Sequence, residues 1–273
     1  MPSDVSRGGP AQGFDAQAAT FDRRAGLDPT VADVVAARVV EYGDPRADHL
    51  VFELGAGTGE IGRHLSTRAR RYVGTDLSLP MLGVFQSKLD AAGEGPSRRL
   101  LVQADGDRCW PVKAGTVGII FASRVAHLLR AAHVVEESRR VCRPGACFLV
   151  GRVERTGMKK ALRREREAIL TRRALAGGRS GARRTEALLE SFMAAGAEPL
   201  AARAVSTWTV TTTAEDVIGA WEGMPSMAGR AVDAATRAEV LGELRRWAGA
   251  RYGALDRPEA ATEMYVLEGV RLL

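Results

Sequence analysis

The sequence predicts an α/β protein with a doubly wound, mostly parallel sheet. The main evidence is the alternation of short apolar runs with helical patterns through residues 14–153. Strands that alternate with helices are joined by right-handed crossovers, which make neighbouring strands parallel and cover both faces of the sheet. The composition agrees, because 273 residues, 45% of them hydrophobic and 26% charged, suffice for a full core.

The predicted elements follow one another in a simple order. Strands are expected at residues 49–55, 71–76, 99–105, 117–123, 147–153, 202–213 and 263–272. Helices are expected at residues 14–24, 30–42, 58–68, 79–92, 132–142, 158–176, 184–195, 214–222 and 236–249. The last two strands are separated by about fifty residues of mainly helical pattern, so we expect them to extend one edge of the sheet.

Several classes of protein are excluded by composition. Three cysteines without CxxC spacing and four histidines argue against a zinc site, any other metal centre or a disulfide framework. The N-terminus lacks the apolar stretch of a signal peptide, and no apolar run approaches the roughly 18 residues of a membrane span. We therefore expect a soluble, cytoplasmic protein.

The most informative segment is VFELGAGTGEIG, residues 51–62. A buried strand leads into a turn in which Gly55, Gly57 and Gly59 permit positive φ and expose bare backbone to a ligand. The expected helix after the turn offers unpaired N–H groups and a positive dipole to a carboxylate or phosphate. The dinucleotide fingerprint GxGxxG is not met, because Glu60 stands at its sixth position.

Two further strand ends carry matching chemistry. Asp76 ends the second strand, where a carboxylate can accept both hydroxyls of a ribose. Asp105 and Gly106 follow the third strand, where a carboxylate and a free N–H can hold an adenine edge. All these strand ends face the crevice in which open parallel sheets bind ligands.

This set of motifs resembles the class I S-adenosylmethionine-dependent methyltransferases, and within them the small-molecule group of methyltransferase type 11 and ubiquinone-biosynthesis enzymes. The segments that carry the resemblance are FDAQAATFDRRAG (14–26), VFELGAGTGE (51–60), YVGTDLS (72–78), QADGD (103–107) and RRVCRPGACFLV (139–150). Two positions depart from the family pattern: Val117-Gly118 replaces Phe-Asp, and Ala146 replaces the second glycine of Pro-Gly-Gly. Neither touches an expected cofactor contact.

The resemblance implies a Rossmann-like, seven-stranded fold and four regions along the chain. Residues 1–13 are expected to be disordered, and 14–153 to form the cofactor-binding core with N-terminal helices covering the cofactor. Residues 154–182 would be a basic helical cap insertion. Residues 183–273 would complete the sheet with a helix–strand pair and carry a second helical cap at about 213–262.

The implied cofactor is S-adenosylmethionine, with S-adenosylhomocysteine as the product. Gly55, Ala56 and Gly57, together with Gly59, would pass under its methionine and ribose portion. Glu53 would lie near the methionine ammonium.

The remaining implied contacts surround the ribose and the adenine. Asp76 would bind the ribose, while Leu77 and Met81 would pack on the adenine. Asp105 and Gly106 would read the amino group and ring nitrogen of the adenine. An ordinary core position for Met81 stays an equal alternative.

At the methionine end, Ser123 would lie beside the cofactor, and Phe21 and Arg24 would close over it. Methyl transfer from a sulfonium is an in-line displacement, so a general base is needed only when the acceptor must lose a proton. The candidate base is His127, and the alternative is that it packs against the cofactor or caps the next helix. Residues 122–125 read ASRV rather than Asn/Asp-Pro-Pro-Tyr, which argues against amide and adenine N-methyltransferases.

The two cap segments are expected to form the acceptor pocket. Their apolar candidates for this pocket are Trp208, Trp221, Met224, Met227 and Trp247. Residues 155–184 hold eleven Lys and Arg against two Glu, which is either a solvated helix face or a surface for something acidic, such as an acidic carrier protein or a phosphate-bearing substrate.

Three functions remain open on the sequence. The first is methyl transfer to a small molecule, such as an aromatic or polyketide-like natural product. The second is an RNA methyltransferase that uses the basic 155–184 segment, although no accessory RNA-binding module accompanies it. The third is a cofactor-binding relative that does not transfer methyl.

Overall fold

The computed structural model describes residues 14–22, 26–42, 50–93, 98–175, 181–222, 226–227 and 230–273. The N-terminal 1–13 segment, Arg24 and Met224 lie outside these described residues. The chain divides into two compact units. The first unit comprises Met1–Arg152, Gly181–Ser206 and Val266–Leu273, and the second comprises Val153–Ser180 and Thr207–Tyr265.

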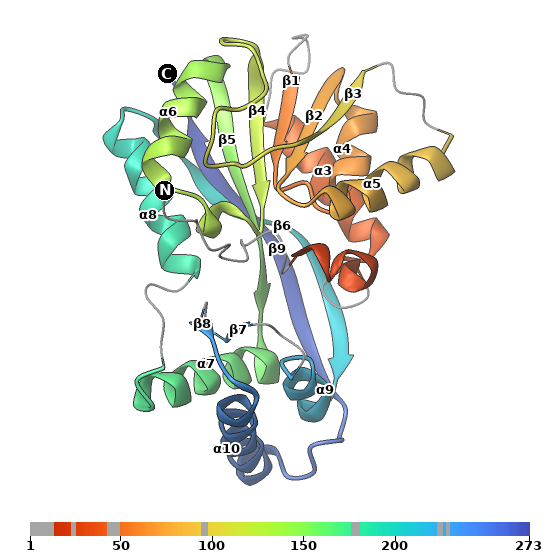
Figure 1. Cartoon of the computed structure of the whole chain (residues 1–273), viewed down its shortest axis with the longest axis vertical. Coiled ribbons are helices and arrows are strands. Elements are labelled where there is room, and N and C mark those ends of the chain that lie inside the picture. The colour runs from red at the N-terminus through yellow and green to blue at the C-terminus, as the bar shows by residue number, and fades with distance from the viewer. Residues whose placement is uncertain are drawn as a thin grey trace, which may run out of the picture. The chain divides into compact units, whose positions relative to one another are not determined.

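A seven-stranded sheet dominates the first unit, in the order β3-β2-β1-β4-β5-β9-β6 (Figure 1). Its strands are β1 (Leu50–Leu54), β2 (Arg71–Asp76), β3 (Arg99–Gln103), β4 (Val117–Ser123), β5 (Cys142–Arg155), β6 (Glu198–Thr212) and β9 (Glu259–Arg271). The pairs β1–β2, β1–β4, β2–β3 and β4–β5 are parallel. The predicted α/β class and mostly parallel sheet are confirmed.

The direction of β9 follows from two backbone hydrogen bonds. Gly145 N donates to Leu272 O at 2.8 Å, and Thr156 N donates to Thr262 O at 3.2 Å. Residue numbers therefore rise along β5 while they fall along β9, so these strands are antiparallel. The last strand in sequence thus inserts between β5 and β6 instead of adding to the outside of the sheet.

The central strands form where the sequence is continuously apolar. All five residues of β1 are buried, as are all residues of β4 except Ser123. Strands buried on both faces read as unbroken Val, Ile, Leu and Phe, because helices cover each side. Phe52, Ile120 and Phe148 are fully buried in this core.

Helices cover both faces of the sheet (Figure 1). On one side lie α3 (Pro29–Glu41), α4 (Gly62–Arg68) and α5 (Leu79–Ala91), and on the other α6 (Ala131–Val141) and α8 (Gly181–Ala194). Two N-caps fix where helices begin: the side chain of Asp28 accepts from Thr30 N, and that of Ser78 accepts from Met81 N.

Several boundaries differ from the prediction, and two of these differences have a local cause. The helix expected from residue 58 begins at Gly62, because Gly57 and Gly59 have φ of +55° and +74°, which an α-helix cannot accommodate. The strand expected from residue 147 begins at Cys142, directly after α6, because Gly145 already pairs with β9.

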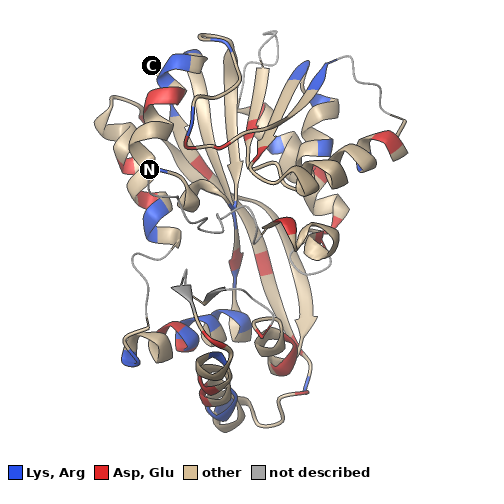
Figure 2. Cartoon of the chain, in the orientation of Figure 1, with Lys and Arg blue, Asp and Glu red and all other residues tan. Residues whose placement is uncertain are grey.

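The second unit contains α7 (Gly157–Arg172), α9 (Ala214–Gly219), α10 (Ala234–Tyr252) and the two-residue strands β7 (Ser226–Met227) and β8 (Arg230–Ala231). Each of the three helices contributes buried apolar side chains to one core, for example Leu162 of α7, Ile218 of α9 and Leu244 of α10. Lys and Arg alternate with Asp and Glu along α7 and α10 (Figure 2). Among the helices described in either unit, none has the length and apolarity needed to span a membrane.

Candidate active site at the carboxyl ends of the strands

The glycine turn after β1 has three residues with positive φ, at +65° for Gly55, +55° for Gly57 and +74° for Gly59. A Cβ on Gly55 would lie 2.8 Å from Val125, and one on Gly59 would lie 2.0 Å from the Phe85 ring. A Cβ on Gly57 would meet no other described residue within 4 Å. Packing therefore requires glycine at the two outer positions, whereas Gly57 exposes bare backbone to space that a ligand can occupy.

Asp76, at the end of β2, is bound to this turn. Gly57 N donates to its Oδ2 at 2.8 Å, and Ser78 N donates to its Oδ1 at 2.8 Å. Burial raises the pKa of Asp76, while these backbone hydrogen bonds lower it. Each carboxylate oxygen keeps a lone pair for a further donor, so the side chain can accept the two hydroxyls of a ribose.

Glu53 lies beneath the turn and is only 2% exposed. Tyr72 Oη donates to Glu53 Oε2 at 2.5 Å, and a Cβ on Gly62 would come within 2.6 Å of the same oxygen. Burial raises the pKa of Glu53 to about 8. In the structure this carboxyl is a partner of Tyr72, and contact with a methionine ammonium stays a prediction.

The N-terminal segment 14–22, with the short helix η1 (Ala18–Thr20), is attached to the glycine turn and to α5. Thr58 Oγ1 donates to Asp22 Oδ1 at 2.5 Å, and Lys88 Nζ donates to Asp22 Oδ2 at 2.5 Å and to Thr58 O at 2.8 Å. Closer to the start of the segment, Ser78 Oγ donates to Asp15 Oδ1 at 2.5 Å. We call residues 14–22 the cover segment.

Arg124 and Glu60 make a second attachment. Arg124 Nη2 donates to Glu60 Oε2 at 2.5 Å, and its guanidinium lies 5.8 Å from the centre of the Phe21 ring. Glu60 also accepts from Leu27 N. Arg124 has φ of +59°, a strained conformation for a residue with a Cβ, and such strain concentrates at functional sites. No pattern in the sequence predicts this role for Arg124, whereas neighbouring Ser123 is a predicted cofactor contact.

The third strand end holds the residues predicted to read the adenine. Asp105 is exposed, and its Oδ1 accepts from Asp107 N at 2.9 Å. A Cβ on Gly106 would lie 2.7 Å from Leu129, so packing explains this glycine. Leu77 is half-buried after β2, whereas Met81 is 3% exposed and belongs to the core. The structure thus favours the core alternative for Met81.

His127 lies beyond β4 in the short helix η2 (Ala126–Leu128), and half-buried Ser123 ends the strand. The half-buried His127 ring borders Gly181 at the start of α8, where an added Cβ would lie 3.2 Å from Cδ2. Burial lowers the pKa of His127, and the charge of Arg184 lowers it further. The ring is therefore neutral at pH 7 and able to accept a proton.

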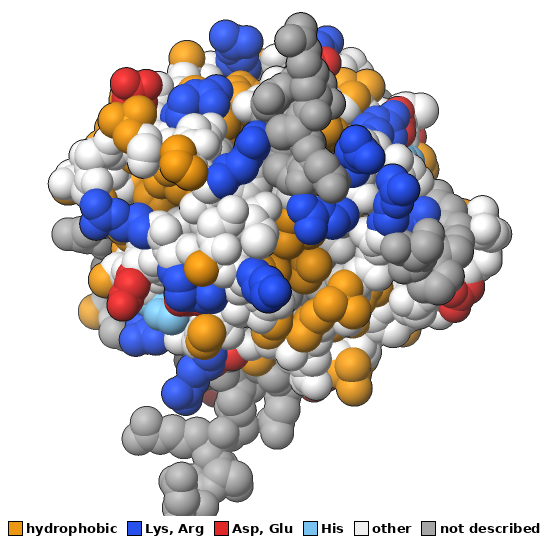
Figure 3. Space-filling model, turned by 90° about the horizontal axis from the view of Figure 1, so that it is seen from above, with side chains coloured by type: hydrophobic (Ala, Val, Ile, Leu, Met, Phe, Trp, Pro, Cys, Tyr) orange, Lys and Arg blue, Asp and Glu red, His pale blue; other side chains and the backbone are white. Residues whose placement is uncertain are grey.

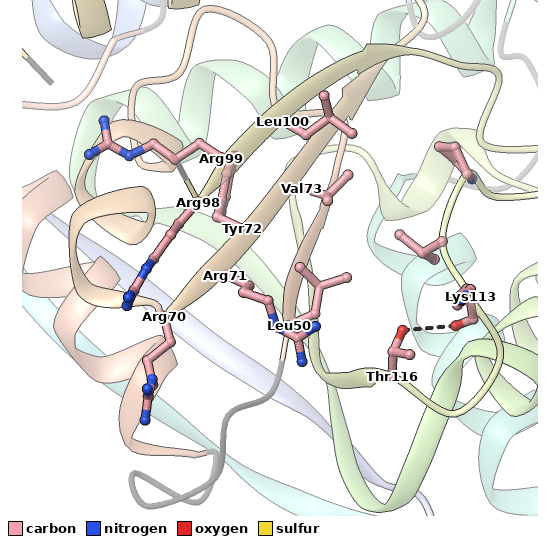
Figure 4. A pocket seen from close by; sticks show the side chains of 12 residues that line it. Leu50, Arg70, Arg71, Tyr72, Val73, Arg98, Arg99, Leu100, Lys113 and Thr116 are labelled. Atoms are coloured by element: carbon pink, nitrogen blue, oxygen red, sulfur yellow. Dashed lines mark hydrogen bonds between the residues drawn. The ribbon is translucent and has the colours of Figure 1, made fainter. Parts of the chain in front are cut away.

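A hollow of about 580 Å³ lies at the opposite edge of the sheet, where the parallel strands begin (Figure 4). Leu50, Tyr72, Val73 and Leu100 line it, together with basic side chains. The basic lining residues are Arg70, Arg71, Arg98, Arg99 and Lys113. Figure 3 looks onto this edge and shows Lys and Arg spread over it. Open parallel sheets bind ligands at their carboxyl ends, so this hollow is not the cofactor site.

Comparison with known proteins defines the class. Residues 52–150, from β1 into β5, match the family model of a methyltransferase domain. Residues 52–150 are thus a methyltransferase domain of the class I S-adenosylmethionine-dependent type, and S-adenosylmethionine is the cofactor of that class. The resemblance found in the sequence is confirmed. No curated protein sequence matches the chain.

Solved structures share the fold at low identity. A candidate type II methyltransferase of Anaeromyxobacter dehalogenans is 17% identical, with a TM-score of 0.60 over 88% of this chain and 96% of its own. The [4+2]-cyclase SpnF is 17% identical, with a TM-score of 0.59 over 96% and 95%. A geranyl diphosphate methyltransferase in complex with S-adenosylmethionine is 12% identical, with a TM-score of 0.52 over 98% and 93%. At these identities the likeness concerns the fold.

The described residues fit the cofactor. Gly57 offers an open backbone, Asp76 a carboxylate anchored to it, and the cover segment lies against the same turn. Within the described ranges, no group of three or more His, Cys, Asp or Glu side chains is arranged to hold a metal ion.

Proposed function

We propose that this protein transfers the methyl group of S-adenosylmethionine to a small-molecule acceptor of specialised metabolism. The observation that carries the proposal is the cover segment, which Asp22 attaches to Thr58 of the glycine turn and to Lys88 of α5. A segment attached across the donor-binding turn restricts access from that side. This arrangement suits an acceptor small enough to enter beside it better than a macromolecule.

Each residue at the strand ends has a part in holding the donor. Gly57 would lie under the methionine and ribose, and Asp76 would accept the ribose hydroxyls while staying bonded to Gly57 N. Asp105 would receive the adenine amino group. Arg124 and Phe21 would close the methionine end, because Arg124 already joins the cover segment to Glu60.

The chemistry that the bound donor supplies is an electrophilic methyl group on a sulfonium. The protein then has to align the acceptor with it and exclude water, which accounts for much of the rate in an in-line displacement. Where the acceptor must lose a proton, neutral His127 would take it through a ring nitrogen. The deprotonated acceptor atom attacks, and the protonated histidine later returns the proton to solvent.

The basic segment 155–184 gives little support to an RNA substrate. Many of its cations are bound within the second unit: Lys159 Nζ lies 2.8 Å from Glu263, Arg172 Nη2 2.9 Å from Glu243, and Arg173 Nη1 2.7 Å from Glu239. These pairs neutralise charge that RNA would otherwise contact. Arg166 is buried, so it does not belong to a basic surface with exposed Arg163 and Arg164.

The proposal also allows the acceptor to be attached to an acidic carrier protein. Arg163 and Arg164 are adjacent, exposed cations of α7 that an acidic carrier protein would contact. Changing both to Glu should raise the KM for a carrier-bound acceptor and leave that for the free acceptor unchanged. If wild type and the double variant have the same KM for the carrier-bound acceptor, the proposed contact with a carrier protein is wrong.

A second function is favoured by one comparison. The cyclase SpnF shares this fold over 95% of its length, so a protein of this shape can serve a reaction other than the one its fold suggests. In that case the donor would stay intact during turnover, and the chain would be a cofactor-binding relative.

One experiment separates these functions. The full chain is incubated with S-adenosylmethionine labelled on the methyl group and with a panel of aromatic and polyketide-like acceptors and total RNA. Label in an acceptor with one S-adenosylhomocysteine formed per product supports the proposal. Label in RNA alone would refute it, and acceptor conversion without S-adenosylhomocysteine would favour the second function.

The proposal includes a cytoplasmic location. It is supported by the three thiols Cys109, Cys142 and Cys147, which form no disulfide with one another.

A further inference from the structure

Arg166 occupies a core position of α7 in the second unit. The buried stripe of this helix consists of Met158, Leu162, Arg166, Ile169 and Leu170. These residues recur at helical spacing and face α9 and α10, where the other members are apolar. Arg166 is 8% exposed, so a guanidinium stands where the pattern calls for a hydrophobic side chain.

The guanidinium has an aromatic neighbour but no acceptor. Its Cζ lies 4.3 Å from the centre of the Trp221 ring, a cation–π contact. Throughout the described part of the chain, no hydrogen bond or ion pair joins Arg166 to another residue, and its Nε is sealed from solvent without a partner. A ring face satisfies none of the N–H donors that lie in the plane of the guanidinium.

Two carboxylates, one on α7 and one on α9, are bound to other arginines. Glu165 accepts from Arg172 at 3.0 Å, and Glu215 accepts from Arg245 at 3.1 and 3.0 Å. Burial lowers the pKa of Arg166 to about 10, with a further contribution from Arg163 and an opposing one from exposed Glu167. The group still carries its charge at pH 7, so a full positive charge is buried without a counter-ion.

The terminal nitrogens differ from Nε. Nε is the one nitrogen of this side chain that is both sealed and without a partner, so the two Nη atoms keep some contact with solvent. They form the side of the guanidinium that binds a carboxylate or phosphate through two parallel hydrogen bonds. The Trp221 ring, whose centre lies 4.3 Å from Cζ, restricts the movement of the group.

We propose that Arg166, in contact with the Trp221 ring, binds an oxyanion group of a small molecule, a carboxylate or a phosphate. The ligand is then an anionic molecule with an apolar body, since the buried residues that form the core of the second unit with α7 are apolar. This inference goes beyond the proposed methyl transfer and does not depend on it. Anion binding itself is measured without the methyl donor.

The test compares the full wild-type chain with Arg166→Leu and Arg164→Leu. Arg164 lies two residues away on α7, is exposed and serves as the matched control. Melting temperatures are recorded with sodium acetate, sodium phosphate or sodium chloride at equal ionic strength, without S-adenosylmethionine. Binding of S-adenosylhomocysteine is measured in parallel by calorimetry.

The expected result has two parts. Acetate or phosphate raises the melting temperature of wild type and Arg164→Leu above that in chloride. The anion that raises it more shows whether the bound group is a carboxylate or a phosphate. Arg166→Leu loses this shift, with anion affinity at least about tenfold weaker, because a charge-assisted hydrogen bond is removed. In chloride Arg166→Leu melts no lower than wild type, since an apolar side chain replaces an uncompensated buried charge.

Three results would overturn the inference. One is the same anion shift in all three proteins, which marks a general effect of charge. Another is no shift in wild type above chloride. The third is a lower melting temperature for Arg166→Leu in chloride with its anion shift intact, which would make Arg166 structural. All three proteins are expected to bind S-adenosylhomocysteine equally well. Loss of this binding would contradict the proposed methyl transfer, whereas the results above contradict only the anion site.

Discussion

Replacing Gly57 and Gly59 by alanine, one at a time, separates the two roles of the glycine turn. Both residues have positive φ, so each substitution costs about 1–2 kcal/mol of backbone strain. At Gly57 the new Cβ meets no atom of the other described residues within 4 Å, so backbone strain is the main cost. At Gly59 the Cβ would lie 2.0 Å from Phe85, which adds overpacking of about 1–3 kcal/mol.

Gly59→Ala should therefore lose more stability than Gly57→Ala, whereas Gly57→Ala should lose affinity for the cofactor. One kcal/mol lowers the melting temperature of a chain of this size by about 2–4 °C, so Gly57→Ala should lose about 2–8 °C and Gly59→Ala distinctly more. The Kd for S-adenosylhomocysteine should rise at least about tenfold in Gly57→Ala, because its methyl group occupies space beside the ligand-facing backbone. A truncating second change, Phe85→Leu, should recover part of the stability lost in Gly59→Ala.

The assays are differential scanning calorimetry of the unliganded proteins and isothermal titration of S-adenosylhomocysteine. The variants are compared at one temperature at which all of them are folded. If Gly57→Ala binds the ligand within twofold of wild type, the open backbone at Gly57 is not the cofactor cradle, and the reasoning from its empty Cβ position is refuted.

The remaining predictions concern four titratable side chains. Asp76→Asn should weaken S-adenosylhomocysteine binding at least about tenfold by calorimetry, since the amide has one acceptor oxygen where the ribose needs two; unchanged affinity would contradict the ribose role. Burial raises the pKa of Glu53 from 4.5 to about 8, so the folded protein keeps a proton that the unfolded chain releases, and stability falls as pH rises from about 4.5 to 8. Glu53→Gln removes this loss and should raise the melting temperature more at pH 8 than at pH 5; an equal change at both values would count against a buried, protonated carboxyl. Asp22→Ala detaches the cover segment and should increase the dissociation rate of S-adenosylhomocysteine about two- to tenfold in stopped-flow measurements, an effect that should be absent if the segment does not cover the ligand. Because burial and Arg184 lower the pKa of His127, kcat should fall only below about pH 6.5, and His127→Asn should abolish that acidic limb; a persisting limb would assign the proton transfer elsewhere.

Local pattern was sufficient to predict most of the fold. The apolar runs that became β1 and β4 are buried along nearly their whole length, and periodicity alone marks such segments. The start of α4 was misplaced because a helical stripe does not reveal that Gly59 has positive φ. Glycine is also required there because Phe85, 26 residues further along the chain, packs where a Cβ of residue 59 would lie.

The candidate site was predictable only where its chemistry lies in short motifs. Asp76 follows from its place at a strand end, and its hydrogen bond to Gly57 N agrees with that prediction. The attachment of Asp22 to Thr58 joins residues 36 positions apart, which no local pattern specifies. Arg166 was grouped with the basic residues around it, although its four-residue spacing from Leu162 would have placed it in the apolar stripe.

The chain passes between the two units four times, and the crossings lie at residues 152–153, 180–181, 206–207 and 265–266. The second unit is therefore built from two insertions, and it contains none of the residues proposed to hold the donor. Recombination or gradual drift can replace both insertions, including Arg166 and Trp221, while the glycine turn and Asp76 stay untouched. A lineage built this way can change its whole second unit without having to rebuild the residues proposed to hold the donor, and laboratory chimeras that exchange residues 153–180 and 207–265 together follow the same division.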